Sequence, residues 1–135
     1  MKDSLVAGIS TTAKILVDRD RTIAFMGDEG RVYATPSMVL DIEYVARNWL
    51  IEHLDDDEDT VGTHVSVDHM AATVEGDSIE VTITVEEVNG RAISMSAHVK
   101  DSLEDVGKGL HNRFVVDKQK TFERLEAKRA QIEAL

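Results

Sequence analysis

Three polar side chains occupy positions at which they could take part in acid–base chemistry. Glu43 lies on the shoulder of an apolar helical stripe, where it is either an edge residue that reaches water or a functional carboxylate, acting as a general base or as an orienting group. His69 shares one face of a predicted strand with two valines, where it is either a satisfied core residue or a catalytic imidazole. Thr35 opens a predicted helix, and its hydroxyl either caps that helix or helps to hold a carbonyl oxygen or a phosphate.

The spacing of Thr35 and Glu43 limits how they could share a site. Eight residues of straight helix separate them by about 12 Å, so they could not touch directly. A common site therefore requires that Thr35 lies in a loop curled back over the helix, or that the two groups meet across a subunit interface.

Other chemistry is disfavoured. The chain has no cysteine, which excludes disulfides, thiolate zinc sites and cysteine nucleophiles. His64, His98 and His111 are interpreted as structural, because no histidine pair has the i, i+4 spacing with a nearby third ligand that zinc requires. The acidic run at residues 55–59 lacks the glycine and the final glutamate of a calcium loop, so it predicts a solvated loop. We expect no metal.

Hydrophobic periodicity predicts the elements that position these residues. A helix is predicted from Thr35-Pro36 to about Leu54, and an irregular loop precedes it over residues 22–33. Period-two alternation predicts strands, with Asn89-Gly90 as a hairpin turn, and the charged C-terminal residues predict a helix with a narrow apolar edge. The expected order is one strand (11–17), the helix, four strands in a meander (61–73, 78–85, 91–99 and 106–116) and a terminal helix (117–135).

Length and composition restrict the number of domains, the partners and the location of this predicted α+β protein. Its 135 residues suit one domain, 1–135. A net charge of −11 and only six aromatic residues argue against nucleic acid as a partner. No apolar run is long enough for a membrane span and the first residues lack a signal-peptide pattern, so we expect a soluble, cytoplasmic protein with no membrane partner.

Taken together, these residues resemble the fluoroacetyl-CoA thioesterase family of the hot-dog superfamily. The resemblance is densest over residues 32–49, 61–73 and 107–122. In that family the first stretch carries a threonine and a glutamate eight residues apart, the second a glycine and a histidine seven residues apart, and the third an arginine. The matching positions here are Thr35, Glu43, Gly62, His69 and Arg113.

The resemblance implies a hot-dog fold, in which an antiparallel five-stranded sheet wraps around one central helix. It implies hydrolysis of an acyl-CoA thioester with a small acyl group, coenzyme A being part of the substrate and no further cofactor being needed. Thr35, Glu43 and His69 would be catalytic, and Gly62 and Arg113 would hold the substrate. Members of the family are homodimers whose sheets join edge to edge, with the sites at the interface.

The pattern departs from the family at one place. A gating phenylalanine is expected in the loop before the threonine, but Glu29 occupies that position, and Phe25 is the nearest phenylalanine. The resemblance therefore predicts a small acyl group without deciding whether fluoroacetyl-CoA is a substrate. Two other functions fit a histidine and a carboxylate: a hot-dog hydratase or dehydratase, and a non-catalytic module that binds acyl-CoA or another small ligand.

Overall fold

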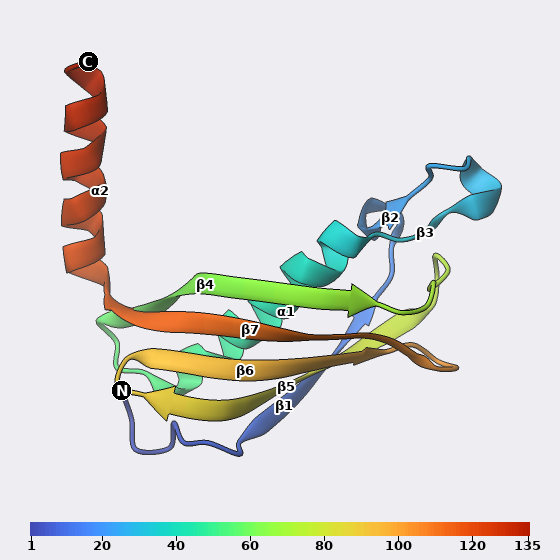
Figure 1. Ribbon diagram of the computed structural model, residues 1–135, viewed down its shortest axis with the longest axis horizontal. Helices are drawn as coiled ribbons and strands as arrows, with labels where there is room; N and C mark the ends of the chain where they lie inside the picture. The colour runs from blue at the N-terminus through green and yellow to red at the C-terminus, as the bar shows by residue number, and fades with distance from the viewer.

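The computed structural model, which describes residues 1–135, contains a five-stranded antiparallel sheet that curls around one long helix (Figure 1). This confirms the predicted hot-dog fold. The helix is α1 (Thr35–Leu50), and a second helix, α2 (Lys118–Glu133), follows the last strand. The strands of the sheet are β1 (Ser10–Leu16), β4 (Glu58–His69), β5 (Ser78–Asn89), β6 (Ala92–Lys100) and β7 (Asp105–Asp117).

The segment between β1 and α1 is largely irregular, as predicted. It contains two short paired strands, β2 (Thr22–Ile23) and β3 (Val32–Tyr33), and two single 3-10 turns, Arg19–Arg21 and Asp28–Gly30. A third 3-10 turn, Ile51–His53, extends α1 towards the buried Leu54. Neither α1 nor α2 has the length and apolar character of a membrane-spanning helix.

The strand order is β1-β5-β6-β7-β4, so the predicted four-strand meander is wrong. Only β5, β6 and β7 follow one another as neighbours. The chain leaves β4 at one edge of the sheet and crosses to β5 on the other side of β7 and β6. Alternation along a strand indicates which face of the strand is buried, but it does not indicate which strand lies beside it. The strand order could therefore not be predicted from this pattern. In the observed order β4 has one free edge.

The core lies between the sheet and α1. The predicted alternation of β5 and β6 is confirmed, since the apolar residues at 79, 81, 83 and 85 and at 93, 95, 97 and 99 are all buried. Met38, Ile42, Ala46 and Leu50 of α1, spaced four residues apart, pack against them with almost no exposed surface. This burial fixes the direction in which the other faces of α1 and β4 point.

The hairpin between β5 and β6 has a two-residue loop, but it is shifted from the prediction. Asn89 pairs with Ala92, so the loop is Gly90-Arg91 and not Asn89-Gly90. Gly90 has a φ of +60° and Asn89 does not have a positive φ. This suits a hairpin turn that needs glycine at its first central position.

Strand β4 contains a bulge that the alternation did not predict. Gly62 pairs with Arg113 and His64 with Asn112, so Thr63 is an extra residue. The bulge reverses the facing of the residues before it. Val61, predicted to share a face with Val65 and His69, is therefore 42% exposed, on the opposite side of the strand.

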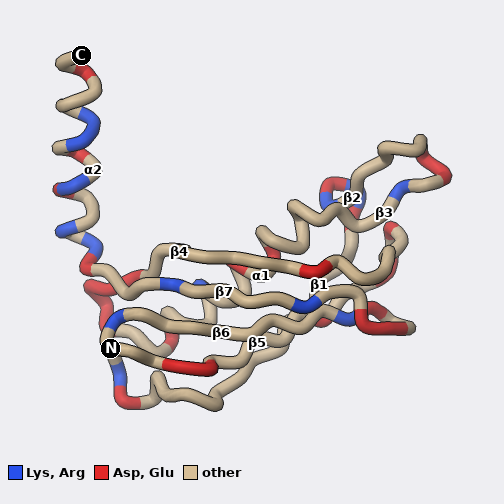
Figure 2. Tube along the Cα trace, viewed as in Figure 1, with Lys and Arg blue, Asp and Glu red and all other residues tan.

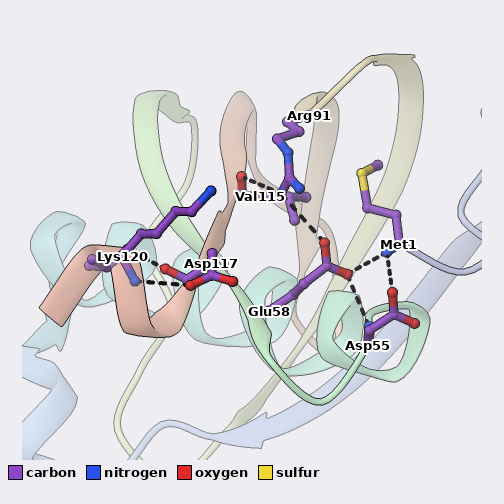
Figure 3. Close-up of polar contacts among 8 residues, drawn as sticks. Met1, Asp55, Glu58, Arg91, Val115, Asp117 and Lys120 are labelled. Atoms are coloured by element: carbon purple, nitrogen blue, oxygen red, sulfur yellow. Dashed lines mark hydrogen bonds and ion pairs between the residues drawn. The ribbon is translucent and has the colours of Figure 1, made fainter. Parts of the chain in front are cut away.

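The acidic run at 55–59 is not simply a solvated loop. Glu58 is buried, because it pairs with the N-terminal ammonium group of Met1 and lies 3.4 Å from Arg91 (Figure 3). The hydrogen bond from Met1 is the main cause that lowers the pKa of Glu58. Asp59 accepts from Arg47 of α1 at 2.6 Å. These cations explain how carboxylates from a charged run enter the start of β4.

Candidate active site

Thr35 and His69 meet although 34 residues separate them in the chain. Thr35 Oγ1 lies 2.7 Å from His69 Nδ1, a normal distance for a hydrogen bond. The N-cap of α1 is Ala34 and makes no side-chain capping bond, so the predicted capping role of Thr35 is wrong. Its hydroxyl is instead directed at the imidazole.

The pair opens into a largely apolar cavity of about 470 Å³. Besides Thr35 and His69, its wall comes from the loop before α1 and from the residues after β4: Ile23, Phe25, Val32, Tyr33, Pro36, Met70, Ala71 and Ala72. An apolar cavity with a few converging polar groups is typical of a site for a small ligand.

A buried network supports His69 from behind. The Tyr33 ring lies edge-on to the His69 ring, with centroids 6.1 Å apart. Tyr33 donates a hydrogen bond of 2.7 Å to Asp41, which also accepts from Arg21 Nε at 3.2 Å. Burial and the Asp41 carboxylate both raise the pKa of Tyr33, so its hydroxyl stays protonated and keeps donating to Asp41. The ring is therefore held in place against the imidazole.

The environment keeps His69 neutral. Burial lowers the pKa of His69 below its ordinary value of 6.5, and the backbone of Ala71 opposes this only in part. The Nε2 atom is buried with no hydrogen-bond partner. Nδ1 is therefore the nitrogen through which this imidazole can exchange a proton with Thr35.

Glu43, Gly62 and Arg113 form a second cluster. A Cβ atom added to Gly62 would lie 2.9 Å from Glu43 Oε1 and 3.3 Å from Arg113 Nη1, so the missing side chain of Gly62 is what leaves room for the carboxylate. Glu43 and Arg113 line a cavity of about 230 Å³ with Leu40, Tyr44 and Arg47.

Arg113 is buried without a carboxylate in contact. Its guanidinium donates to Thr60 Oγ1 at 2.7 Å and to the Thr60 carbonyl at 2.9 Å. Burial lowers the pKa of Arg113, while the charge of Glu43 opposes that shift. A buried cation held mainly by neutral acceptors keeps part of its charge available to an anion, which suits a substrate contact.

His111 belongs to this cluster, and the sequence analysis missed it. It is fully buried, its Nδ1 lies 2.7 Å from the His64 carbonyl, and its Nε2 lies 3.2 Å from Arg113 Nη1. Nδ1 must donate to the carbonyl, so Nε2 accepts from Arg113 and the imidazole is neutral. Burial lowers its pKa accordingly. Its two-residue spacing from Arg113 was the signal, since such residues share a face of a strand.

Within one chain the structure therefore brings Thr35 to His69, and Gly62 and Arg113 to Glu43. The two cavities share no lining residue, and about 12 Å of helix separates Thr35 from Glu43. The position expected for a gate, Glu29, is exposed in a 3-10 turn and does not line the Thr35 cavity, whereas Phe25 does.

Comparisons with known proteins point to one family. Residues 17–119 match the family described as fluoroacetyl-CoA-specific thioesterase. The chain is 29% identical to the fluoroacetyl-CoA thioesterase of Streptantibioticus cattleyicolor over 89% of this chain and 91% of that enzyme. A solved structure of a fluoroacetyl-CoA thioesterase superposes with a TM-score of 0.84 at 27% identity, over 93% of this chain and 98% of the other.

Two further structural comparisons bear on fold and ligands. A hypothetical protein of Thermus thermophilus, described as a thioesterase superfamily member, shares the fold with a TM-score of 0.88 at 23% identity, over 96% of each chain. Variants of the fluoroacetyl-CoA thioesterase have been solved with fluoroacetate and CoA and with acetyl-CoA.

Substitution of Gly62 should displace the Glu43 carboxylate with little effect on the stability of the protein. In Gly62→Ala the new methyl group meets most closely the end of the flexible Glu43 side chain, and next the end of the Arg113 side chain at 3.3 Å. We therefore expect Glu43 to rotate away and the free energy of unfolding to fall by less than about 1 kcal/mol. Urea denaturation and a crystal structure of the variant would measure the two effects.

Gly109→Ala is the matched control. There the added Cβ would overlap the Ser66 carbonyl oxygen, a backbone atom of the neighbouring strand that cannot rotate away. We therefore expect a loss of more than about 2 kcal/mol. Equal destabilisation of the two variants, or an unmoved Glu43 carboxylate in Gly62→Ala, would contradict the arrangement described.

Proposed function

Because the chain belongs to the fluoroacetyl-CoA-specific thioesterase family, we propose that it hydrolyses acyl-CoA thioesters with a small acyl group. The observation that carries the proposal is the hydrogen bond of 2.7 Å between the exposed Thr35 hydroxyl and a partly buried, neutral His69 at a largely apolar cavity. A hydroxyl and a base within hydrogen-bond reach form the basic unit of nucleophilic catalysis.

Thr35 Oγ1 is the attacking oxygen in this proposal. Since His69 Nε2 is buried, the only basic nitrogen directed at the cavity is Nδ1, and that atom holds the Thr35 hydroxyl. Thr35 Oγ1 attacks the thioester carbonyl carbon as its proton passes to Nδ1. The C–S bond then breaks, the CoA thiolate takes that proton, and the acyl group remains as an ester on Thr35.

Glu43, Gly62 and Arg113 act in the same site from a second copy of the chain. Pairing of the free edge of β4 with its symmetry mate would run antiparallel, which brings the Gly62 half of one β4 beside the His69 half of the other. Such a homodimer, with sheets joined edge to edge, unites the two cavities. It also satisfies the unpaired backbone groups of the edge strand.

Each residue of the second cluster then has a role. The Gly62 N–H donates to the oxyanion that forms on the thioester carbonyl oxygen, and the Arg113 cation holds the substrate. Glu43 takes a proton from the water that attacks the acyl-Thr35 ester. That proton returns to Thr35 Oγ1 as the ester bond breaks, so the net reaction is thioester plus water to carboxylic acid plus thiol.

Replacement of Thr35 tests this proposal. Thr35→Val removes the hydroxyl but keeps the shape, and kcat for a short acyl-CoA should fall by about 10²- to 10⁴-fold, while Thr35→Ser should retain most of the rate. Release of free thiol measures the reaction directly and distinguishes a hydrolase from a hydratase or a binding module. Full activity of Thr35→Val would contradict the assigned nucleophile.

The pH dependence of kcat/KM tests the state of His69. The imidazole must be neutral to accept a proton, so the rate should be constant at high pH and fall tenfold per unit as His69 becomes protonated. Because burial lowers the pKa of His69, the midpoint of this acid limb should lie below 6.5. Circular dichroism at each pH would separate this effect from acid unfolding. A midpoint above 6.5 would contradict the assignment of His69 as a partly buried, neutral base.

A further inference from the structure

Helix α2 projects from the sheet and is not packed on its own chain. None of its residues is buried, although Phe122, Leu125 and Ile132 recur at three- and seven-residue steps on one side. Each of these side chains remains half exposed or more. In Figure 1 the helix rises past the β4 edge of the sheet, into the space that lies beside the free strand.

The direction of α2 is fixed at its base. The Asp117 carboxylate accepts a hydrogen bond of 2.9 Å from the Lys120 amide and caps the helix (Figure 3). The Lys118 amide donates to the Asp57 carbonyl at 2.9 Å, and the Lys118 ammonium group donates to the Asp56 carbonyl at 3.0 Å. The first turn is thus tied to the loop before β4, so the apolar stripe is presented at a defined place.

The opposite end of the sheet carries a matching surface, which we call the β4-exit surface. It consists of the loop after β4, residues 70–77, and the loop between β6 and β7, residues 101–104. Thr73 Oγ1 donates to Asp101 at 2.9 Å and the Ser102 amide donates to Asp77 at 3.2 Å, so the two loops form one unit. Val74 and Leu103 are 63% and 90% exposed on it.

The charges of the two surfaces are complementary. Between Lys118 and Glu133, α2 has five basic and three acidic residues, in a chain whose net charge is −11. The β4-exit surface carries Glu75, Asp77, Asp101 and Glu104 and no basic residue. Figure 2 shows Lys and Arg recurring along α2. Long-range attraction would therefore favour their contact.

A single chain cannot make this contact. The α2 base lies at the Glu58 end of β4 and the β4-exit surface follows His69, so about 36 Å of strand separates them. Antiparallel pairing of two β4 edges inverts one strand relative to the other. It places the β4-exit surface of one copy beside the α2 helix of the other, which runs for about 24 Å along it.

We propose that α2 is an element exchanged between subunits: in the β4-paired homodimer, its apolar stripe packs on the β4-exit surface of the second copy. This rests on the edge-to-edge dimer of the proposed function and extends it. Because residues 70–72 of that surface also line the Thr35–His69 cavity, each α2 braces the wall of the acyl site in the other subunit. A second copy is the occupant because it supplies both the matching charge and the required position.

Site-directed cross-linking tests this contact, since the chain has no native cysteine. Chains carrying Leu125→Cys are mixed with affinity-tagged chains carrying Leu103→Cys or Val74→Cys, exchanged under mild denaturant, and treated with a short bifunctional maleimide. We expect a covalent heterodimer as the main cross-linked product on a denaturing gel. Every such link joins two chains, because each chain carries one cysteine.

Val6→Cys is the matched control partner. Val6 is 49% exposed and apolar, but it lies at the end of the fold where Met1 pairs with Glu58. In the antiparallel dimer this end of one subunit lies far from the α2 helix of the other. A Leu125→Cys link to Val6→Cys at equal yield would overturn the proposal.

Light scattering on the same samples separates the two claims. A dimer that forms no Leu125→Cys link to Leu103→Cys or Val74→Cys overturns the exchange of α2 and leaves the proposed enzyme intact. A monomer at all concentrations overturns the edge-to-edge dimer as well. Thiol release by the unmodified protein, measured in parallel, tests the activity independently of both.

Discussion

The β-bulge at Thr63 lets one strand present Gly62 and His69 to the same face of the sheet. These residues are seven positions apart, and in a regular strand an odd separation places two side chains on opposite faces. The extra residue restores a common facing towards α1, where Glu43 meets Gly62 and Thr35 meets His69. Without it, either Gly62 would lose its place beside the Glu43 carboxylate or His69 would lose its contact with Thr35.

Because α1 is a continuous helix, it keeps Thr35 and Glu43 apart within one chain. Once Thr35 is bonded to His69, Glu43 lies about two turns farther along and faces the earlier part of β4. The same strand therefore carries one half of the proposed site near each end, and its outer edge is unpaired. The proposed antiparallel dimer along that edge would join the halves, and it would give α2 a surface to cover.

Features that depend on neighbouring residues could be predicted from the sequence, whereas contacts between residues far apart in the chain could not. The helix beginning near Pro36 and the buried faces of β5 and β6 follow from periodicity. The family resemblance indicated the fold and suggested five site positions, which stay a prediction. Periodicity could not reveal the bulge at Thr63, because the inserted residue looks like any other in an alternating pattern. It also left His111 unassigned and gave Thr35 a capping role, since hydrogen-bond partners 34 or more residues away leave no local trace.

Subunit complementation tests the shared site most directly. Thr35→Val and Glu43→Gln homodimers should each be nearly inactive, but exchange of subunits between them creates heterodimers in which one site keeps both native residues. An equal mixture should therefore recover about a quarter of the native thiol release. If activity does not rise above that of the separate variants although heterodimers form, then Thr35 and Glu43 do not act from different subunits.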